Sequence, residues 1–257
     1  MKSIATLLLA GIVQLGFAGS ALAESDLAKI QSAGVFKIGT EGTYPPFTYH
    51  DASGALTGFD VDIGREIAKR LKVKPEFVEG KWDGLIAGLD AKRYEAVINQ
   101  VSITPERQAK YDFSTPYITS KAALIVRDDN KTIKGFDDLK GKKSAHTLTS
   151  NYAQLARGYG ADVVGTDGFN QSVDLVASGR ADATINDNLS FLDFKKHKPD
   201  APVKIVATRS DAEEIGIVIR KGDTDLKAAI DKALAEIKSD GTYQRISQKY
   251  FGADVSQ

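Results

Sequence analysis

Short apolar segments of strand length alternate along this chain with segments of helical periodicity. Residues 35–39, 75–78 and 96–101 are apolar runs that predict buried strands. Between them, residues 60–71 and 82–89 carry apolar side chains at spacings of three and four, which is typical of a helix packed on a sheet. This β-α-β-α-β order predicts an α/β fold in which helices flank a mostly parallel sheet.

The same alternation starts again after residue 120, which predicts a second sheet with its own helices. Ser150 and Asn170 are placed to cap two of these helices. No Gly/Ser-rich or Pro-rich linker separates the two units, so we expect two lobes joined by a hinge of two strands, at residues 119–124 and 214–218. The remaining predicted strands cover residues 122–126, 141–148, 181–185, 203–207 and 215–219, and the helices cover residues 151–157, 170–177, 188–196, 226–237 and 243–250. Lobe 1 is predicted to comprise residues 24–119 and 215–257, and lobe 2 residues 120–214.

The first 23 residues have the organisation of an export signal. Lys2 provides a positive start, residues 4–17 are largely apolar, and Ala21-Leu-Ala23 is a small-x-small cleavage pattern. The sequence therefore predicts a signal peptide, residues 1–23, and a mature protein in the periplasm. An uncleaved membrane anchor is the alternative, but the apolar core is short for a span. The chain has no cysteine, so it lacks the residue that carries a bacterial lipid anchor and can form no disulfide.

Charge and motif content argue against several function classes. The 34 basic and 34 acidic residues balance, which does not favour a nucleic-acid partner. The three histidines, His50, His146 and His197, are too scattered to predict a metal site. Walker loops, nucleophile elbows and zinc-protease motifs are missing, although a catalytic triad can assemble from distant positions. We therefore expect no enzyme activity, no metal and no cofactor.

The segment of residues 96–107 carries the strongest indication of a binding site. An apolar run ends in the polar residues Asn99, Gln100 and Ser102, and Arg107 follows one short turn later. A guanidinium beyond the end of a strand is well placed for a bidentate contact with a carboxylate. The plainer interpretation, a strand and a turn followed by a surface arginine, remains open from this segment alone.

Several motifs together resemble the polar amino-acid-binding proteins of bacterial ABC importers. They occur in the order expected for that family over essentially the whole mature chain. The motifs are TEGTYPPF at residues 40–47, LTGFDVD at 56–62, WDGLI at 82–86, residues 96–107, YDFSTPY at 111–117, GRADATIND at 179–187 and KSDGTY at 238–243 with KYFG at 249–252. The resemblance implies a periplasmic-binding-protein fold, an amino-acid ligand bound by hinge closure and an ABC permease in the inner membrane as partner. We expect a monomer.

The resemblance also implies roles for residues on both lobes. It assigns the ligand α-carboxylate to Arg107, helped by the Ser102 hydroxyl or backbone N–H, and adds backbone N–H groups of Ser150 and Asn151 at a helix N-terminus. It assigns the α-ammonium to Asp187, whose burial without a cationic partner would be costly. For Asp187, a plain helix cap is the alternative.

Aromatic and polar residues are expected to surround the ligand side chain. The resemblance places Tyr44 and Trp82 as aromatic walls, although Trp82 could equally be core and Tyr44 turn packing. Further residues are expected to tune side-chain choice, and they are Glu41, Asn99, Gln100 and Tyr152.

The sequence is closest to the L-cystine-binding branch of this family. The Asn99-Gln100 pair, KWDG at residues 81–84 and KYDF at 110–113 favour cystine, with glutamine or another polar amino acid as the alternative. Thr149 stands where glycine is common in the family, which leaves the lobe 2 contacts of the carboxylate open. An enzyme on the same scaffold, similar to cyclohexadienyl dehydratase, is the remaining alternative, with Glu41 as its candidate acid or base.

Overall fold

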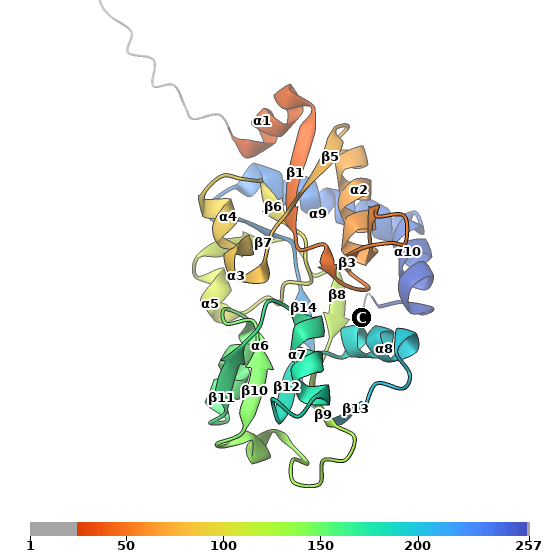
Figure 1. The fold of residues 1–257 in the computed structure, drawn as a ribbon. Coiled ribbons are helices and arrows are strands. Elements are labelled where there is room, and N and C mark those ends of the chain that lie inside the picture. The colour runs from red at the N-terminus through yellow and green to blue at the C-terminus, as the bar shows by residue number, and fades with distance from the viewer. Residues whose placement is uncertain (1–24, 256–257) are drawn as a thin grey trace, which may run out of the picture.

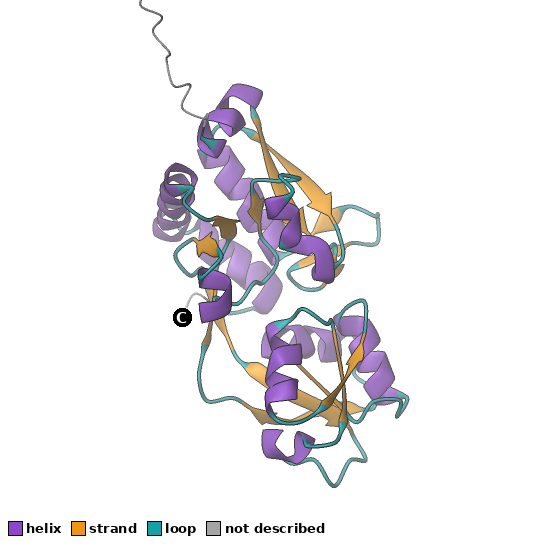
Figure 2. Cartoon of the chain, turned by 90° about the vertical axis from the view of Figure 1, so that its left-hand side faces the viewer, coloured by secondary structure: helices purple, strands orange, loops and turns teal. Residues whose placement is uncertain are grey.

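The computed structural model describes residues 25–255 and contains two α/β lobes, one above the other in Figure 1. A short pair of strands, β8 (Ile118–Ser120) and β14 (Glu213–Ile215), connects them. Figure 2 shows each lobe from the side as strands enclosed by helices. The predicted two-lobed α/β fold is therefore confirmed. The predicted signal peptide lies outside the described residues.

Lobe 1 is the part of the chain built on the sheet β5-β1-β6-β15-β7, and the chain enters it twice. Its first passage consists of α1 (Asp26–Ala33), β1 (Val35–Thr40), β2 (Thr43–Tyr44), β3 (Thr48–His50), β4 (Leu56–Thr57), α2 (Phe59–Arg70), β5 (Lys74–Glu79), α3 (Trp82–Leu85), α4 (Ala87–Asp90), β6 (Ala96–Val97), α5 (Pro105–Gln108) and β7 (Tyr111–Phe113). Its second passage consists of β15 (Val218–Arg220), α9 (Thr224–Ser239) and α10 (Thr242–Phe251).

Lobe 2 is built on the sheet β11-β10-β12-β9-β13. Its elements are β9 (Ala122–Arg127), the 3₁₀ helix η1 (Phe136–Leu139), β10 (Lys143–His146), α6 (Asn151–Gly158), β11 (Asp162–Gly165), α7 (Phe169–Ala177), β12 (Ala183–Asp187), α8 (Asn188–His197) and β13 (Val203–Thr208).

The two sheets share one pattern of strand directions. In lobe 1, β5, β1 and β6 are parallel, and β15 is inserted antiparallel between β6 and β7. In lobe 2, β11, β10 and β12 are parallel, and β9 is inserted antiparallel between β12 and β13. Each inserted strand directly follows a crossing between the lobes, β9 on the way out and β15 on the way back. The sheets are thus mostly parallel, as predicted, with one reversed strand each.

Alternation along the strands explains why helices cover both faces of each sheet. Ala96 and Ile219 face the core formed with α2, α9 and α10, whereas Val97 and Val218 face the core formed with α3 and α4. Successive strand residues point to opposite faces, so a fully apolar strand requires cover on both. Lobe 2 repeats this arrangement, with α6 on one face and α7 and α8 on the other.

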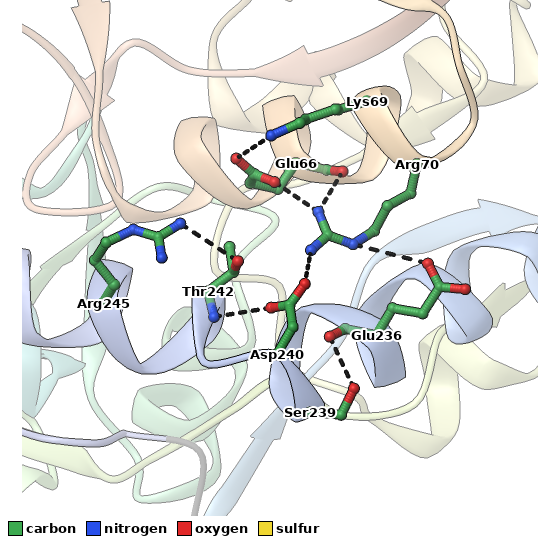
Figure 3. Close-up of polar contacts among 8 residues, drawn as sticks. All are labelled: Glu66, Lys69, Arg70, Glu236, Ser239, Asp240, Thr242 and Arg245. Carbon is green, nitrogen blue, oxygen red and sulfur yellow. Dashed lines mark hydrogen bonds and ion pairs between the residues drawn. The ribbon is translucent and has the colours of Figure 1, made fainter.

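A charged network fastens the C-terminal helices to lobe 1 (Figure 3). Arg70, at the end of α2, donates to Glu66 Oε2 and to Asp240 Oδ2 at 2.5 Å each, and its Nε lies 3.8 Å from Glu236 Oε2. The Arg70 side chain is largely buried, at 14% exposure. One guanidinium therefore joins α2 to α9 and to the turn before α10.

The hinge consists of the antiparallel pair β8 and β14, in which Thr119 opposes Glu214. This position agrees with the two crossings predicted near residues 119–124 and 214–218. The predicted strand of residues 215–219 is in fact two strands, because the chain leaves β14 in the hinge and joins the lobe 1 sheet as β15. The lobe boundaries at residues 119/120 and 214/215 stay a prediction.

Three further predictions of local structure differ from the structure. The predicted strand of residues 96–101 keeps its sheet pairing only at β6, because the backbone turns away and Gln100 has a φ of 49°. The predicted helix of residues 82–89 is divided into α3 and α4 at Ile86. Asn170 is not a cap, since α7 begins one residue earlier and the Gly168 carbonyl accepts its first hydrogen bond, from Ser172 N–H.

Within residues 25–255, no helix has the length and apolar content needed to cross a membrane.

Candidate functional site

A pocket lies between the lobes, at the ends of strands from both sheets. Lobe 1 contributes the loops after β1 and β6, strand β2 and the start of α3, and lobe 2 contributes the segments from β10 into α6 and from β11 into α7 and the end of β12. Ligands of open α/β sheets commonly bind beyond strand carboxyl ends. The lining residues are Glu41, Tyr44, Trp82, Gln100, Thr147, Ser150, Asn151, Tyr152, Gly168, Phe169 and Asn186.

Direct contacts between the lobes surround this pocket. The Tyr44 hydroxyl donates to Asn186 Oδ1 at 2.6 Å. On the outer side of Trp82, the Asp83 carboxylate accepts hydrogen bonds from Thr149 N–H at 2.9 Å and Thr149 Oγ1 at 2.8 Å. These bonds hold the two lobes together over the pocket, so the structure represents a closed conformation.

Arg107 lies on α5, which Thr104 caps through a hydrogen bond from the Arg107 N–H to its Oγ1. The guanidinium donates to the Ser102 carbonyl at 2.8 Å and to Asn151 Oδ1 at 3.4 Å, and it lies 5.4 Å from the Trp82 ring centroid. Burial lowers the pKa of Arg107 to about 10. Within the described residues no carboxylate forms an ion pair with it, so no salt bridge neutralises its charge.

Asp187 ends β12 and caps α8, and it is fully buried. Its Oδ1 accepts from Leu189 N–H at 2.8 Å, while its Oδ2 accepts from Gln100 Nε2 of lobe 1 at 3.0 Å. Burial raises the pKa of Asp187. The predicted helix-cap and ligand roles are therefore compatible, because the cap uses one oxygen and the other faces lobe 1.

Gln100 bridges two buried carboxylates. Its backbone N–H donates to Asp60 Oδ2 at 2.6 Å, and its side-chain amide donates to Asp187 across the lobe interface. Asp60 also accepts from the Tyr117 hydroxyl at 2.8 Å, and burial raises the pKa of Asp60 to about 7. The Oε1 atom of Gln100 is buried and, within the described residues, has no hydrogen-bond partner. A ligand with N–H groups beside Asp187 would satisfy it.

Glu41 and Asn99 form a reciprocal pair at another part of the pocket wall. Asn99 Nδ2 donates to Glu41 Oε2 at 2.6 Å, and Asn99 Oδ1 accepts from Glu41 N–H at 2.7 Å. Burial raises the pKa of Glu41 to about 7, against the stabilising hydrogen bond from Asn99. Asn99 itself is fully buried, so it supports Glu41 and does not line the pocket.

Aromatic rings form the apolar walls of the pocket. Tyr44 contacts Phe169 of lobe 2 edge-on at 6.1 Å and Phe47 of its own lobe at 5.4 Å. Trp82 stands between the pocket and Arg107, and its Nε1–H is buried without a partner among the described residues. An unpaired indole donor in a pocket wall indicates an acceptor on the ligand.

The N-terminus of α6 closes the lobe 2 side. Ser150 is its cap, as predicted, and its Oγ accepts from Ala153 N–H at 3.1 Å. Asn151 contacts lobe 1, since its Nδ2 lies 3.3 Å from Ser102 Oγ. The Tyr152 hydroxyl donates to Glu213 Oε2 at 2.8 Å.

The structure places the eleven predicted site residues at the interface of the lobes, but not all of them line this pocket, since Arg107 and Ser102 each line a neighbouring hollow. Seven line the pocket, and the other four contact lining residues; these are Asn99, Ser102, Arg107 and Asp187. Thr147, Gly168, Phe169, Asn186 and Glu213 were missed. Asn186 precedes Asp187 and Phe169 precedes a predicted helix, so proximity to predicted elements could have indicated them, whereas no local signal marks Glu213. No cluster of three metal-ligating side chains occurs within the described residues.

A family model described as bacterial extracellular solute-binding proteins, family 3, matches residues 36–253. The chain belongs to this family. The L-cystine-binding protein TcyA of Bacillus subtilis is 46% identical to this solute-binding protein over 231 residues, which cover 90% of this chain and 86% of TcyA. The L-cystine-binding protein TcyJ of Escherichia coli is 41% identical over 260 residues, which cover 100% of this chain and 96% of TcyJ.

Solved structures of similar proteins differ in how well they superpose on this solute-binding protein. An ancestral arginine-binding protein bound to arginine is 42% identical, with a TM-score of 0.81 over 85% of this chain and 99% of its own. The L-cystine solute receptor of Neisseria gonorrhoeae, in an unliganded open conformation, is 44% identical, with a TM-score of 0.59 over 90% of this chain and 99% of its own. The lower score despite higher identity agrees with the closed arrangement of the lobes described above.

A third solved structure bears on the enzyme alternative. An ancestral amino acid-binding protein, described as a precursor of cyclohexadienyl dehydratase, is 36% identical, with a TM-score of 0.80 over 88% of this chain and 99% of its own.

Proposed function

We propose that this protein is the amino-acid-binding component of an ABC importer and that its ligand is L-cystine. The observation that carries the proposal is the pair of opposite charges left for a ligand at the lobe interface. Arg107 of lobe 1 has no ion-pair partner within the described residues, and Asp187 of lobe 2 is a buried carboxylate with only neutral donors. A zwitterion supplies a carboxylate to the first and an ammonium to the second.

Two further polar groups support a ligand with a second charged end. Glu41 is a pocket carboxylate that accepts a hydrogen bond from the neutral amide of Asn99, and Trp82 Nε1–H is a donor without a partner within residues 25–255. L-cystine has two amino-acid ends, so its second ammonium can donate to the Glu41 carboxylate and its second carboxylate can accept from Trp82 Nε1–H. The names of TcyA, TcyJ and the gonococcal receptor agree with this choice. The absence of cysteine also means that the chain has no thiol to exchange with a disulfide ligand.

The mechanism we propose is ligand-stabilised closure about the hinge of β8 and β14. The ligand binds Arg107 of lobe 1 in the open state, and closure brings Asp187 and the start of α6 onto it. Only the closed state makes both sets of contacts, so binding shifts the population toward it. The closed protein then docks on an inner-membrane permease, and we expect it to act as a monomer in the periplasm after removal of residues 1–23.

An enzyme on this scaffold is the second candidate. Glu41, with its pKa raised to about 7, is the residue suited to proton transfer, and the dehydratase precursor is a structural relative. In our proposal Glu41 is instead engaged by the ligand, and its bond to Asn99 holds it at the wall. Glutamine or another polar amino acid remains the alternative ligand.

Thermal unfolding in the presence of each amino acid and of cystine tests the proposal. A ligand present at a hundred times its Kd adds about 2.7 kcal/mol to the free energy of unfolding. For a protein of this size that corresponds to a rise of about 5–10 °C in Tm. We expect the largest rise with L-cystine. A larger rise with glutamine would overturn the cystine assignment, and no rise with any amino acid would overturn the proposed function.

A further inference from the structure

Glu213 of the hinge strand β14 contacts both lobes beside the pocket. A single oxygen, Oε2, accepts hydrogen bonds from Ser102 Oγ of lobe 1 at 3.2 Å and from the Tyr152 hydroxyl of lobe 2 at 2.8 Å. The motifs that mark the other site residues do not include this position. Glu213 is thus a hinge carboxylate bound to two residues expected in the ligand site.

Glu213 and the ligand carboxylate compete for the proton of the Ser102 hydroxyl. This hydroxyl has one proton, which it donates to Glu213, and it already lies as an acceptor 3.3 Å from Asn151 Nδ2. The family resemblance pairs Ser102, through its hydroxyl or its backbone N–H, with Arg107 at the ligand carboxylate, and we take the hydroxyl to be that donor. One proton cannot be donated to two carboxylates, so ligand binding must release Glu213 from Ser102.

The charges around Glu213 make this release costly while Glu213 is ionised. The titratable groups whose charges interact with it are Tyr152 on α6, Arg107 on α5, Asp187 at the end of β12 and Tyr44 of β2. Arg107 is the one cation among them, and a carboxylate bound to Arg107 would weaken the electrostatic stabilisation that Arg107 gives to ionised Glu213. Burial raises the pKa of Glu213, and the charge of Asp187 acts in the same direction, whereas Tyr152, Ser102 and Arg107 lower it.

We propose that Glu213 takes up a proton when the ligand carboxylate binds, so that ligand binding is coupled to protonation of the hinge. The proton comes from solvent, and the neutral carboxyl then donates its O–H to Ser102 Oγ. Ser102 accepts from Glu213 and Asn151 and turns its own proton to the ligand carboxylate, which leaves every group in the set paired. This inference rests on the proposed function, because it requires a ligand with a carboxylate at Arg107.

Isothermal titration with L-cystine in buffers of different ionisation enthalpy measures the number of protons taken up. The informative variant is Glu213→Gln, whose Oε1 can still accept from Ser102 and Tyr152. Glu214→Gln is the matched control, because Glu214 is exposed on the same strand and points to the opposite side. Glu213→Ala is a second variant without any carboxyl or acceptor.

We expect the wild type and Glu214→Gln to take up more protons than Glu213→Gln and Glu213→Ala at mildly acidic pH. Relative to Glu213→Gln, the wild-type Kd should fall as pH falls, by up to about tenfold per pH unit where one proton is linked. Equal proton uptake and parallel pH profiles for wild type and Glu213→Gln would overturn the inference while leaving the proposed function intact. Absence of binding of cystine and of every other amino acid to the wild type would overturn both.

Discussion

At the scale of single residues, the proposed site depends on two charges, on Arg107 and Asp187, that have no ion-pair partner within residues 25–255. Arg107 was predicted because polar residues follow an apolar run before it, whereas Asp187 was predicted from the resemblance to the amino-acid-binding family. The residues that contact them were harder to predict from the sequence. Gln100 reaches Asp187 only because its backbone adopts a φ of 49° and is held by Asp60, and no sequence pattern specifies that geometry. Glu213 enters the site through β14, a strand whose hinge pairing is non-local.

Replacement of Arg107 by alanine should remove ligand binding and preserve the fold. Loss of one partner from a buried, hydrogen-bonded charge pair costs about 2–5 kcal/mol, or about 30-fold to 4,000-fold in Kd. Titration calorimetry gives the Kd, and near-ultraviolet circular dichroism checks the fold. Arg157→Ala is the control, since Arg157 is exposed on α6. An Arg107→Ala protein with wild-type affinity would refute the role of Arg107.

Replacement of Asp187 by asparagine should have opposite effects on stability and on binding. Burial raises the pKa of Asp187 in the folded state, so its ionisation opposes folding once pH exceeds the unfolded-state value, and most fully above the folded-state pKa. Asparagine keeps an acceptor for the α8 cap and removes the charge. At neutral pH we expect an unchanged or higher Tm without ligand, together with a weaker Kd. A lower ligand-free Tm with unchanged Kd would contradict this assignment.

At the scale of elements, regular structure was predictable wherever its cause is local. The cap at Ser150 and the periodicity of α2 specify their helices directly. The parts that were missed depend on distant segments. Strand β6 is only two residues long because β1 and β15 pair with it there and the chain must then turn toward the pocket. The division between β14 and β15 likewise follows from the return of the chain through the hinge.

The Arg70 network should stabilise lobe 1 without affecting the ligand site (Figure 3). Arg70→Ala removes contacts to Glu66, Glu236 and Asp240, and a partly buried network of this kind contributes about 1–2 kcal/mol. We expect a Tm lower by about 2–8 °C and an unchanged Kd. Lys69→Ala, at the exposed neighbouring position, should change the Tm little. Equal effects of the two variants on Tm would show that the network contributes nothing.

At the scale of the whole molecule, closure involves lobe contacts that no ligand is needed to form. Asp83 of α3 accepts from Leu148 N–H, Thr149 N–H and Thr149 Oγ1, and Lys81 pairs with Asp167 at 3.0 Å. Lys81 and Asp83 flank Trp82 along the chain. The affinity for the ligand therefore depends on the free energy of closure as well as on ligand contacts.

Removal of the Asp83 contacts should open the ligand-free protein. We expect Asp83→Ala to increase the radius of gyration without ligand, measured by small-angle X-ray scattering, and to weaken the Kd several-fold. Saturating ligand should restore the compact form. Asp162→Ala, an exposed site on β11, is the control. A compact ligand-free Asp83→Ala protein with unchanged Kd would mean that other contacts hold the lobes closed.

The central claim is that the two lobes clamp a zwitterion, with its carboxylate on Arg107 and its ammonium on Asp187. Calorimetric titration with L-cystine and two analogues tests it most directly. Cystamine keeps the disulfide and both amines but lacks the carboxylates, and 3,3′-dithiodipropionic acid keeps both carboxylates but lacks the amines. We predict that L-cystine binds and that each analogue binds at least about 30-fold more weakly, since each leaves a buried charge unpaired. Binding of either analogue as tightly as L-cystine would contradict the account.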